Sequence, residues 1–349
     1  MSLLFSICIP TINRTDYLLQ ALNSILTNNS FLDRIEICIS NNCSETDYSE
    51  VESFIKEGSN LCKIKYFRHD SRIPLDENHQ FVVKMASTEY IYFLGDDDYF
   101  LRDQIQNLVA FIQEKNPDLA VFNGFVIDSD NIYLGEHFNL PPREYLSLAP
   151  AFRDLRDKCS FGAVLVNKNL LQEFDFKALY GTDHAYGCFW LSIFRKYERN
   201  ELIKIYVPDF PCVAIRSAQK TYNHIYVYYK TIPHWLNVYK KLAGPGIPQQ
   251  LINEYIESTY ELISSFKFLL SLIATGYNLH LIEDANPLLY KKYKVKILTC
   301  MCLYATGVYQ IFKMLYKKII KNKQSGNMKH DTAVVNYLIS SVHKKNIQI

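Results

Sequence analysis

The sequence predicts an α/β protein with a doubly wound, largely parallel sheet and a C-terminal helical extension. Short apolar runs bounded by polar turns alternate with segments whose apolar residues recur at helical spacing. Polar clusters follow several of the predicted strands, at the edge where open sheets of this kind bind ligands. After a last predicted strand at residues 213–217 the pattern is helical. We therefore expect two domains, residues 1–220 and residues 221–349.

The predicted strands and helices follow one another through the first third of the chain. Five strands are expected at residues 3–9, 35–39, 63–68, 90–94 and 119–124. After the first strand, Leu18, Leu22 and Ile25 share one helical face, and Asn13 or Thr15 can cap that helix. Strands that alternate with helices at this spacing are typical of a parallel sheet.

Three consecutive carboxylates, Asp96, Asp97 and Asp98, follow the fourth predicted strand. Residues 90–94 before them are all apolar or aromatic, which is typical of a strand buried on both faces. Apolar residues at helical spacing come directly after, so we expect the carboxylates in a turn between a strand and a helix. One Asp would be enough to cap that helix, so three carboxylates favour a cation site over a simple cap.

Composition and motifs argue against several common functions. Lys and Arg exceed Asp and Glu by only two over 349 residues, which gives no support to nucleic-acid binding. The chain contains no G-x-G-x-x-G and no G-x-x-x-x-G-K-[ST] motif. It therefore lacks the signatures of dinucleotide-binding dehydrogenases and of P-loop NTPases.

The cysteines and the N-terminal residues predict an intracellular protein. Nine cysteines are an odd number and form no C-x-x-C pair, so we expect reduced thiols and neither disulfides nor structural zinc. Residues 3–9 are apolar but lack a basic start and a cleavage site, so they are interpreted as a strand and not as a signal peptide. The expected location is the cytoplasm.

Three motifs, in this order, resemble those of the family 2 glycosyltransferases, which have the GT-A fold. They are SICIPTINR at residues 6–14, ISNNCS at 39–44 and FLGDDD at 93–98. The resemblance is strong over about the first 125 residues and continues more weakly to about residue 216. Within the family the chain is most similar to bacterial sugar transferases, including the abequosyltransferase-like group, that build O-antigen and other surface polysaccharides. This resemblance implies transfer of a sugar, with inversion, from a nucleoside diphosphate to a glycan acceptor, which is expected to be lipid-linked.

The resemblance also implies a divalent cation, Mg²⁺ or Mn²⁺, at the turn that contains Asp96, Asp97 and Asp98, called the acidic turn below. Asp97 or Asp98 would be its ligand, and Asp96 would face the ribose or the metal. The register of an Asp triplet is ambiguous, so all three are candidate metal ligands. Bound there, the cation would neutralise the charge that develops on the leaving diphosphate.

The nucleotide pocket is expected where the first motif, with Pro10, Thr11, Asn13 and Arg14, meets the turn after the second strand. Thr11 and Asn13 should border the base and the ribose. Asn41 stands where relatives usually have an Asp that accepts the base N–H, and its amide oxygen can still accept. Plain turn chemistry is the alternative role for Asn41.

Other residues are weaker candidates for contacts with the donor. Asn78 has a solvated surface loop as its alternative. Arg216, in the last predicted strand, either closes over the diphosphate, which a guanidinium suits, or is an ordinary surface arginine. Ile12 stands where many relatives have an aromatic residue that stacks on the base, so the identity of the base stays open.

Asp183 and His184 are the candidate catalytic base. Inversion in a single displacement needs a group that takes the acceptor hydroxyl proton. Similar relatives carry a Gly-Thr-x-His-type segment here, which favours His184, whereas a carboxylate base is commoner across the family and favours Asp183. The alternative is an Asp that caps a helix, with a neighbouring histidine.

A lysine-flanked apolar run in the C-terminal region predicts attachment to a membrane surface. Residues 297–312 are uncharged, and sixteen residues are too few for a bilayer, which needs about 20. Lysines lie on both sides: Lys291, Lys292, Lys294 and Lys296 before the run, and Lys313, Lys317, Lys318 and Lys321 after it. A helix in the interface at the cytoplasmic face of the inner membrane is expected, with a buried bundle helix as the alternative.

Two other functions fit parts of the sequence. A sugar nucleotidyltransferase would share the α/β sheet and an acidic metal turn, but it would need a loop rich in Gly and Lys or Arg after the first strand, which residues 10–14 lack. A non-catalytic sugar-nucleotide-binding module is allowed by Ile12 and Asn41 but disfavoured by the intact acidic triplet.

Overall fold

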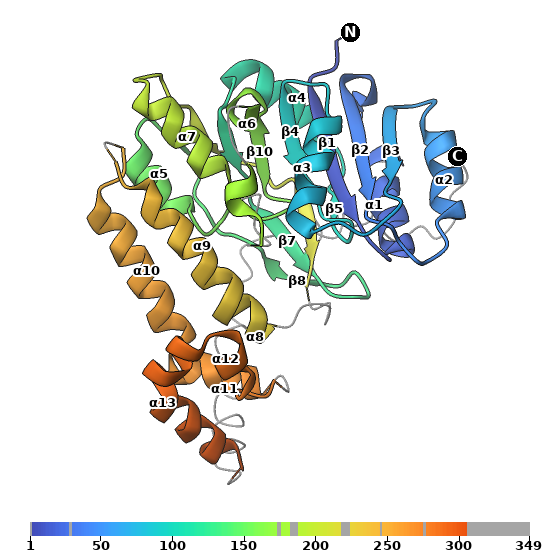
Figure 1. The fold of residues 1–349 in the computed structure, drawn as a ribbon. Coiled ribbons are helices and arrows are strands. Elements are labelled where there is room, and N and C mark those ends of the chain that lie inside the picture. The colour runs from blue at the N-terminus through green and yellow to red at the C-terminus, as the bar shows by residue number, and fades with distance from the viewer. Residues whose placement is uncertain are drawn as a thin grey trace. The chain divides into compact units, whose positions relative to one another are not determined.

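The computed structural model describes residues 2–27, 30–172, 176–181, 188–217, 224–244, 246–274 and 277–305. Contacts between residues divide these ranges into two compact units. The first unit contains residues 2–217 together with 246–247, and the second contains residues 224–244 and 248–305, coloured gold to red in Figure 1.

An eight-stranded sheet forms the centre of the first unit (Figure 1). Its strands, in spatial order, are β3 (Lys63–Arg68), β2 (Ile35–Asn41), β1 (Phe5–Thr11), β4 (Tyr90–Phe93), β10 (Val164–Asn167), β6 (Leu119–Val121), β11 (Ile205–Val207) and β9 (Arg143–Tyr145). The four strands from β3 to β4 are parallel, whereas β10 and β9 run antiparallel to their neighbours. The predicted α/β class with a mostly parallel sheet is confirmed.

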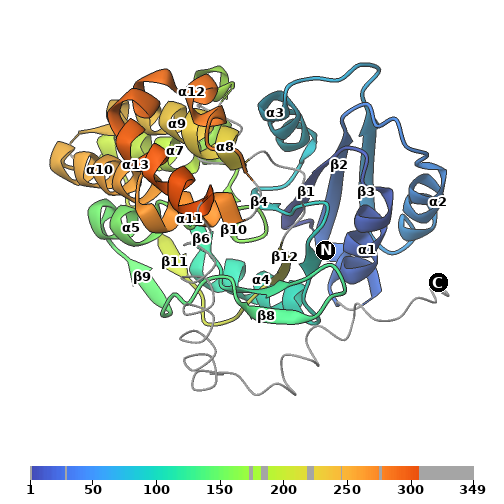
Figure 2. The ribbon, with the colours of Figure 1, turned by 90° about the horizontal axis from the view of Figure 1, so that it is seen from below.

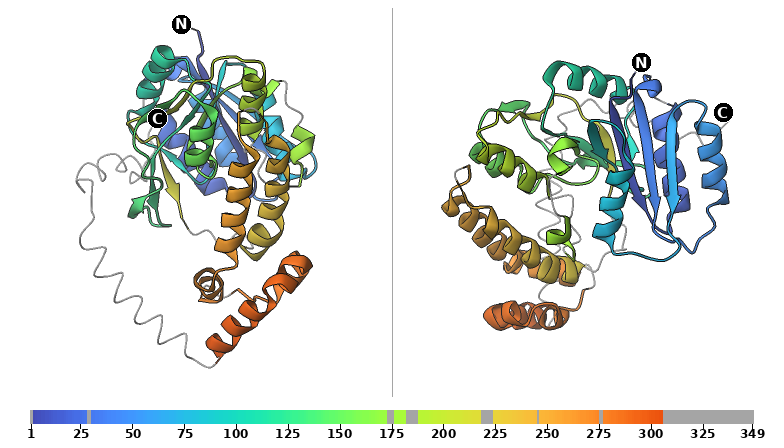
Figure 3. Two further views of the ribbon diagram at one scale, coloured as in Figure 1. Left: turned by 90° about the vertical axis from the view of Figure 1, so that its left-hand side faces the viewer. Right: turned by 45° about the horizontal axis from the view of Figure 1, so that its top comes forward.

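Helices cover both faces of the parallel strands. The helices of the first unit are α1 (Thr15–Thr27), α2 (Ser49–Gly58), α3 (Leu75–Met85), α4 (Gln104–Lys115), α5 (Leu148–Leu155), α6 (Asn169–Gln172) and α7 (Cys188–Glu198). In Figure 2, α3 lies on one face of β1–β3 and α1 and α2 lie on the other. Figure 3 shows β1–β3, in blue, side by side in its right-hand view. This double winding lets both faces of the strands be apolar.

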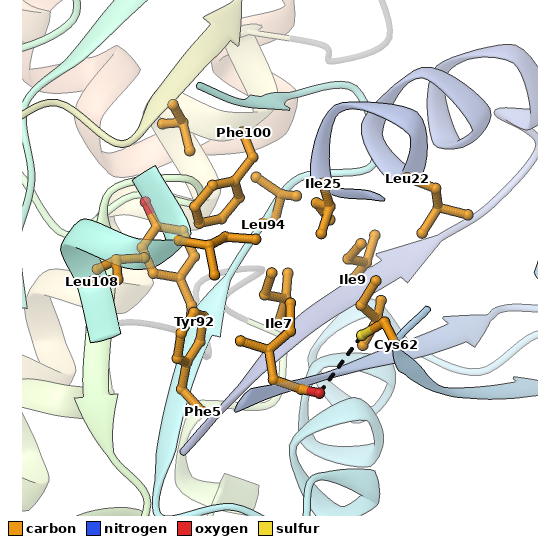
Figure 4. Close-up of a cluster of buried hydrophobic side chains, with 14 of the residues drawn as sticks. Phe5, Ile7, Ile9, Leu22, Ile25, Cys62, Tyr92, Leu94, Phe100 and Leu108 are labelled. Atoms are coloured by element: carbon orange, nitrogen blue, oxygen red, sulfur yellow. Dashed lines mark hydrogen bonds between the residues drawn. The ribbon is translucent and has the colours of Figure 1, made fainter. Parts of the chain in front are cut away.

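The core between the sheet and its helices explains why these strands are fully apolar. Figure 4 shows side chains from β1, β4 and α1 pointing toward one another, among them Ile7, Ile9, Tyr92 and Ile25. Each of these four is completely buried. Burial of an aliphatic or aromatic side chain of this size contributes about 1.5–3 kcal/mol, so the strands that bring the polar turns together are firmly held.

A second, four-stranded sheet contains the last strand predicted from the sequence, at residues 213–217, but its other strands were not predicted separately. Its order is β5 (Tyr99–Phe100), β12 (Val213–Arg216), β7 (Gly124–Ile127) and β8 (Tyr133–Glu136). The strand predicted at residues 119–124 is in fact two strands, β6 and β7, in different sheets. The chain bends at Asn123, whose side-chain amide bonds both the N–H and the carbonyl of Leu140. The acidic residues likewise lie between β4 and the two-residue β5, and α4 begins only at Gln104.

The second unit is helical, as the sequence predicts. Its elements are α8 (His224–Tyr226), a π-helical turn (Val227–Thr231), α9 (Ile232–Tyr239), α10 (Gln249–Ile263), α11 (Phe266–Ala274), α12 (Leu281–Ala285) and α13 (Pro287–Ala305). Tyr229, Leu269, Ile282 and Ile297 belong to its own apolar core. Among the described residues, no helix has both the length and the apolar character that a membrane crossing needs.

Candidate functional site

The ends of β1 and β2 bring two of the predicted motifs together. Thr11 and Asn41 are partners in the parallel register, and the backbone N–H of Asn42 donates to the carbonyl of Thr11 at 2.9 Å. The hydroxyl of Thr11 lies 3.0 Å from the hydroxyl of Tyr48. Pro10, one residue earlier, pairs in register with Ser40. The expected meeting of these turns is present in the structure.

Asn13 and Asn41 hold the turn that follows β2. Asn13 adopts a left-handed conformation (φ 54°), and its side-chain oxygen accepts from the N–H of Glu45 at 2.7 Å. The amide oxygen of Asn41 accepts from the N–H of Ser44 at 2.9 Å, and its NH₂ group donates to Tyr66 at 2.9 Å. Both asparagines thus have structural roles, and an amide oxygen has a second lone pair with which a nucleotide N–H could bond.

The acidic turn is paired with an arginine from the first motif. Nη1 of Arg14 lies 2.8 Å from Oδ1 of Asp96 and 2.8 Å from Oδ2 of Asp97. Burial raises the pKa of Asp96 to about 6, although the Arg14 charge opposes that rise. Burial and the charge of Asp97 also raise the pKa of Asp98 well above its usual range. Closely spaced carboxylates with little water around them favour a bound cation.

Asp98 is hydrogen-bonded to the backbone of β12, behind the acidic turn. Its Oδ1 accepts from the backbone N–H of Arg216 at 3.1 Å. Gly162 has φ +76°, and a Cβ there would come within 3.2 Å of Asp98 Oδ2 and 3.1 Å of a Val213 methyl group. At Gly95 a Cβ would lie only 2.7 Å from the same carboxylate oxygen. Glycine at both positions therefore leaves room for the Asp98 carboxylate.

Arg216 braces the acidic turn from the second sheet. Its guanidinium donates to the carbonyls of Asp97, Asp128 and Ser129 at 3.0–3.3 Å. It also stacks on the rings of Tyr17 and Tyr99, 4.8 and 4.9 Å from their centroids. The side chain is buried, so the alternative of an ordinary surface arginine is wrong. Closure over a diphosphate would require the guanidinium to leave these carbonyls.

Asn78 lies in α3 and is buried, so its surface-loop alternative is also wrong. Its amide oxygen accepts from the hydroxyl of Ser40 at 2.6 Å, and its NH₂ group donates to the Ser40 carbonyl at 3.3 Å. The residue therefore links α3 by hydrogen bonds to the end of β2, directly before the turn that contains Asn41 and Asn42. A supporting role behind the pocket follows from these contacts.

The candidate bases Asp183 and His184 lie outside the described residues. The segment that leads to them is anchored to α3: the N–H of Gly181 donates to Oδ2 of Asp76 at 2.9 Å, and the hydroxyl of Tyr180 donates to Gln80 at 2.6 Å. Asp76 is a buried carboxylate that the sequence interpretation missed. Acidic residues are common in the first turn of a helix, where they interact favourably with the helix dipole, so its position gave no signal of a further role.

The donor set at the acidic turn fits a divalent cation. One carboxylate oxygen from Asp96 and one from Asp97 converge on a single cationic nitrogen, so the chain already directs two hard oxygen ligands at one point. Within the described ranges, no three His, Cys, Asp or Glu side chains come together to hold a metal ion unaided. Mg²⁺ commonly takes one or two carboxylates and completes its octahedron with water and phosphate oxygens, which matches this set.

A cavity of about 500 Å³ opens beside Arg14. It is lined by residues from the turn after β1 and the start of α1, and from the turn before α2 and the start of α2: Asn13, Arg14, Thr15, Asp16, Tyr17, Thr46, Asp47, Ser49 and Glu50. The volume lies in the range of small-ligand sites. Arg14 therefore borders the acidic turn on one side and open space on the other.

Comparison with known proteins finds matches over the region that contains the three motifs. The profile of glycosyl transferase family 2 matches residues 6–174. The chain is 28% identical over 208 residues to abequosyltransferase RfbV of Salmonella typhimurium, covering 55% of this chain and 61% of that protein. It is 25% identical over 117 residues to poly(ribitol-phosphate) β-N-acetylglucosaminyltransferase TarS of Staphylococcus aureus, covering 34% of this chain and 20% of TarS. The chain thus spans less than two thirds of the length of either relative.

The fold is also similar to a solved glycosyltransferase structure. The crystal structure of S. aureus TarS 1–349 in complex with UDP-GlcNAc superposes with a TM-score of 0.60 at 15% sequence identity. The superposition covers 87% of this chain and 92% of that one. At this identity the likeness concerns the fold alone.

Proposed function

Since this chain is a family 2 glycosyltransferase with the GT-A fold, we propose that it moves a sugar from a nucleoside diphosphate donor to a glycan, with inversion. The observation that carries the proposal is the convergence of Arg14, Asp96 and Asp97 beside the joined turns of β1 and β2. The acceptor we propose is a lipid-linked glycan of a bacterial surface polysaccharide. Similarity to an abequosyltransferase and to a poly(ribitol-phosphate) β-N-acetylglucosaminyltransferase supports sugar transfer.

Each part of the proposed site has a separate task. Thr11, Asn13 and Asn41 would border the nucleotide, and Arg14 would contact the diphosphate. Asp96 and Asp97 would hold Mg²⁺ or Mn²⁺, which when bound supplies Lewis-acid stabilisation of the leaving diphosphate. Asp183 or His184 would take the proton of the acceptor hydroxyl. Residues 1–220 would form the catalytic domain.

Calorimetry with UDP, GDP, CDP and dTDP, each with and without Mn²⁺, tests the donor class. We expect one diphosphate to bind only in the presence of metal, and Asp97→Ala to weaken that binding at least tenfold because one of two convergent ligands is lost. Replacing Asp96, Asp97 and Asp98 together by Ala should abolish it. Glu89→Gln, an exposed change at the other end of β4, should leave binding unchanged. Binding that ignores both the metal and the substitutions would contradict the proposal.

We also propose that the second unit, within the predicted region 221–349, attaches to the cytoplasmic face of the membrane. In α13, Lys291, Lys292 and Lys294 are exposed beside the exposed apolar residues Leu288 and Val295. Exposed lysines next to apolar side chains suit an anionic lipid surface. The run predicted at residues 297–312 enters α13, where Ile297 and Cys300 are buried in the helical core, and residues 306–312 lie outside the described ranges.

Vesicle binding tests the attachment. We expect the protein to co-sediment with phosphatidylglycerol vesicles and not with phosphatidylcholine vesicles. Changing Lys291, Lys292 and Lys294 to Gln should reduce the vesicle partition coefficient at least tenfold, since each lysine near an anionic surface contributes about 1 kcal/mol. The control changes three exposed lysines of the first unit, Lys56, Lys84 and Lys177, to Gln. Equal losses in both triple variants would show general charge attraction and contradict the assignment to α13.

A further inference from the structure

Arg14 occupies the position at which the acidic turn would receive a metal ion. A single nitrogen, Nη1, is 2.8 Å from Oδ1 of Asp96 and 2.8 Å from Oδ2 of Asp97. The three side chains are largely withdrawn from water, with exposed fractions of 16%, 8% and 19% for Arg14, Asp96 and Asp97. Charge-assisted hydrogen bonds of this length in a sheltered place are strong, so Arg14 is a firm partner of both carboxylates.

Arg14 and a divalent cation cannot share this position. Mg²⁺ binds oxygen at about 2.0–2.1 Å, so an ion held by these two oxygens would lie within contact distance of the present guanidinium nitrogen. The two cations would also repel each other in a site with little water to screen them. A metal ion that enters must therefore displace the Arg14 side chain from the carboxylates.

The two arginines at the turn have different surroundings. Arg216 is fixed by backbone carbonyls of Asp97, Asp128 and Ser129 and by two tyrosine rings, so it belongs to the scaffold. Arg14 reaches the turn through its guanidinium and lines the cavity of about 500 Å³. When a cation binds Asp96 and Asp97, the Arg14 side chain can move into the open space beside it.

We propose that Arg14 is a built-in counter-ion that the metal must displace, so that metal and nucleoside diphosphate bind together. This inference rests on the proposed function. A cation that enters alone costs Arg14 both of its carboxylate partners. A diphosphate that enters with the cation offers anionic oxygens to the displaced guanidinium, which suits phosphate. Each ligand therefore raises the affinity for the other, and by linkage the factor is the same in both directions.

Titration of Mn²⁺, followed by the electron paramagnetic resonance of the free ion, tests the proposal without requiring turnover. We expect the wild type to bind Mn²⁺ weakly alone and at least tenfold more tightly with UDP, GDP, CDP or dTDP, each tried separately. Arg14→Gln should bind Mn²⁺ alone at least tenfold more tightly than the wild type, because no internal cation competes. The diphosphate should then enhance Mn²⁺ binding by a correspondingly smaller factor.

Two further variants make the result specific. Arg14→Lys keeps the positive charge and should keep the weak binding of Mn²⁺ alone. Arg143→Gln removes an equal charge from an exposed ion pair with Asp154, and should behave as the wild type does. Thermal unfolding of each variant, compared with the wild type, verifies that the affinities belong to folded protein.

The outcomes separate this inference from the proposed function. If a diphosphate binds the wild type with metal, but Arg14→Gln binds Mn²⁺ alone no more tightly than the wild type, the counter-ion role is wrong and the proposed function stands. Tighter Mn²⁺ binding by Arg143→Gln as well would show a general charge effect and would also overturn it. If none of the four diphosphates binds any form with metal, the proposed function and this inference both fail.

Discussion

Replacing Asp97 by Asn should lower kcat/KM for sugar transfer by about 10²–10³-fold, the loss typical of removing one preorganised charge-stabilising group. Asp97 is the most exposed of the three acidic side chains, so it is the best placed to reach an incoming cation. Its amide replacement has the same size but no negative charge, so a metal ion would lose one of two convergent carboxylate ligands. Initial rates with the donor found by calorimetry measure the change.

The distribution of this loss between kcat and KM is informative. Stabilisation of charge that develops only in the transition state should be lost mainly from kcat, whereas a purely structural carboxylate would change stability. Glu89→Gln is the matched control, because it neutralises an exposed carboxylate directly before β4, at the end of that strand away from the acidic turn. Activity of Asp97→Asn within tenfold of the wild type, in a protein of unchanged thermal stability, would remove Asp97 from the catalytic site.

The parallel part of the large sheet, β1 to β4, could be predicted because its strands form apolar runs in the sequence, whereas β9 and β11 were not predicted. The apolar runs that become β1, β2 and β4 are buried on both faces, and their order along the chain is that of consecutive strand–helix units. In the second sheet, only β12 matches a predicted strand. β5 has only two residues, and β7 is separated from β6 by a bend at Asn123, whose side chain bonds to the distant Leu140. Such contacts leave no periodic pattern.

The candidate site was predicted at the level of turns and missed at the level of side-chain partners. The parallel register of β1 and β2 brings Thr11 to Asn41, as the motif order requires. The pair Arg14–Asp96 joins positions 82 residues apart, and the bond from Gly181 to Asp76 joins positions 105 apart. Partners at such separations are fixed by the packed fold, so sequence patterns alone could not identify them.

Glu36→Gln should destabilise the protein by about 3 kcal/mol at neutral pH. Glu36 is a fully buried carboxylate in β2, and its Oε2 lies 3.1 Å from Nζ of both Lys63 and Lys65. Burial alone would raise its pKa, but hydrogen bonds from Ser87 and Ser6 and the contact with Lys65 outweigh burial and lower the pKa from 4.5 to about 2. Gln keeps the shape but loses the charge on which these bonds depend, and each pKa unit corresponds to about 1.4 kcal/mol.

The pH dependence of that loss identifies its cause. Between pH 4.5 and pH 2 the unfolded Glu36 binds a proton and the folded one does not, so its contribution is complete above about pH 4.5 and is lost as pH falls through the folded pKa. The difference in free energy of unfolding between wild type and Glu36→Gln, measured by denaturant unfolding, should therefore decrease by about 1 kcal/mol from pH 6 to pH 3.5. Glu114→Gln, at an exposed pair with Lys115, should show no such decrease. If this difference in free energy of unfolding stays constant with pH, Glu36 stabilises the fold by packing and not by its charge.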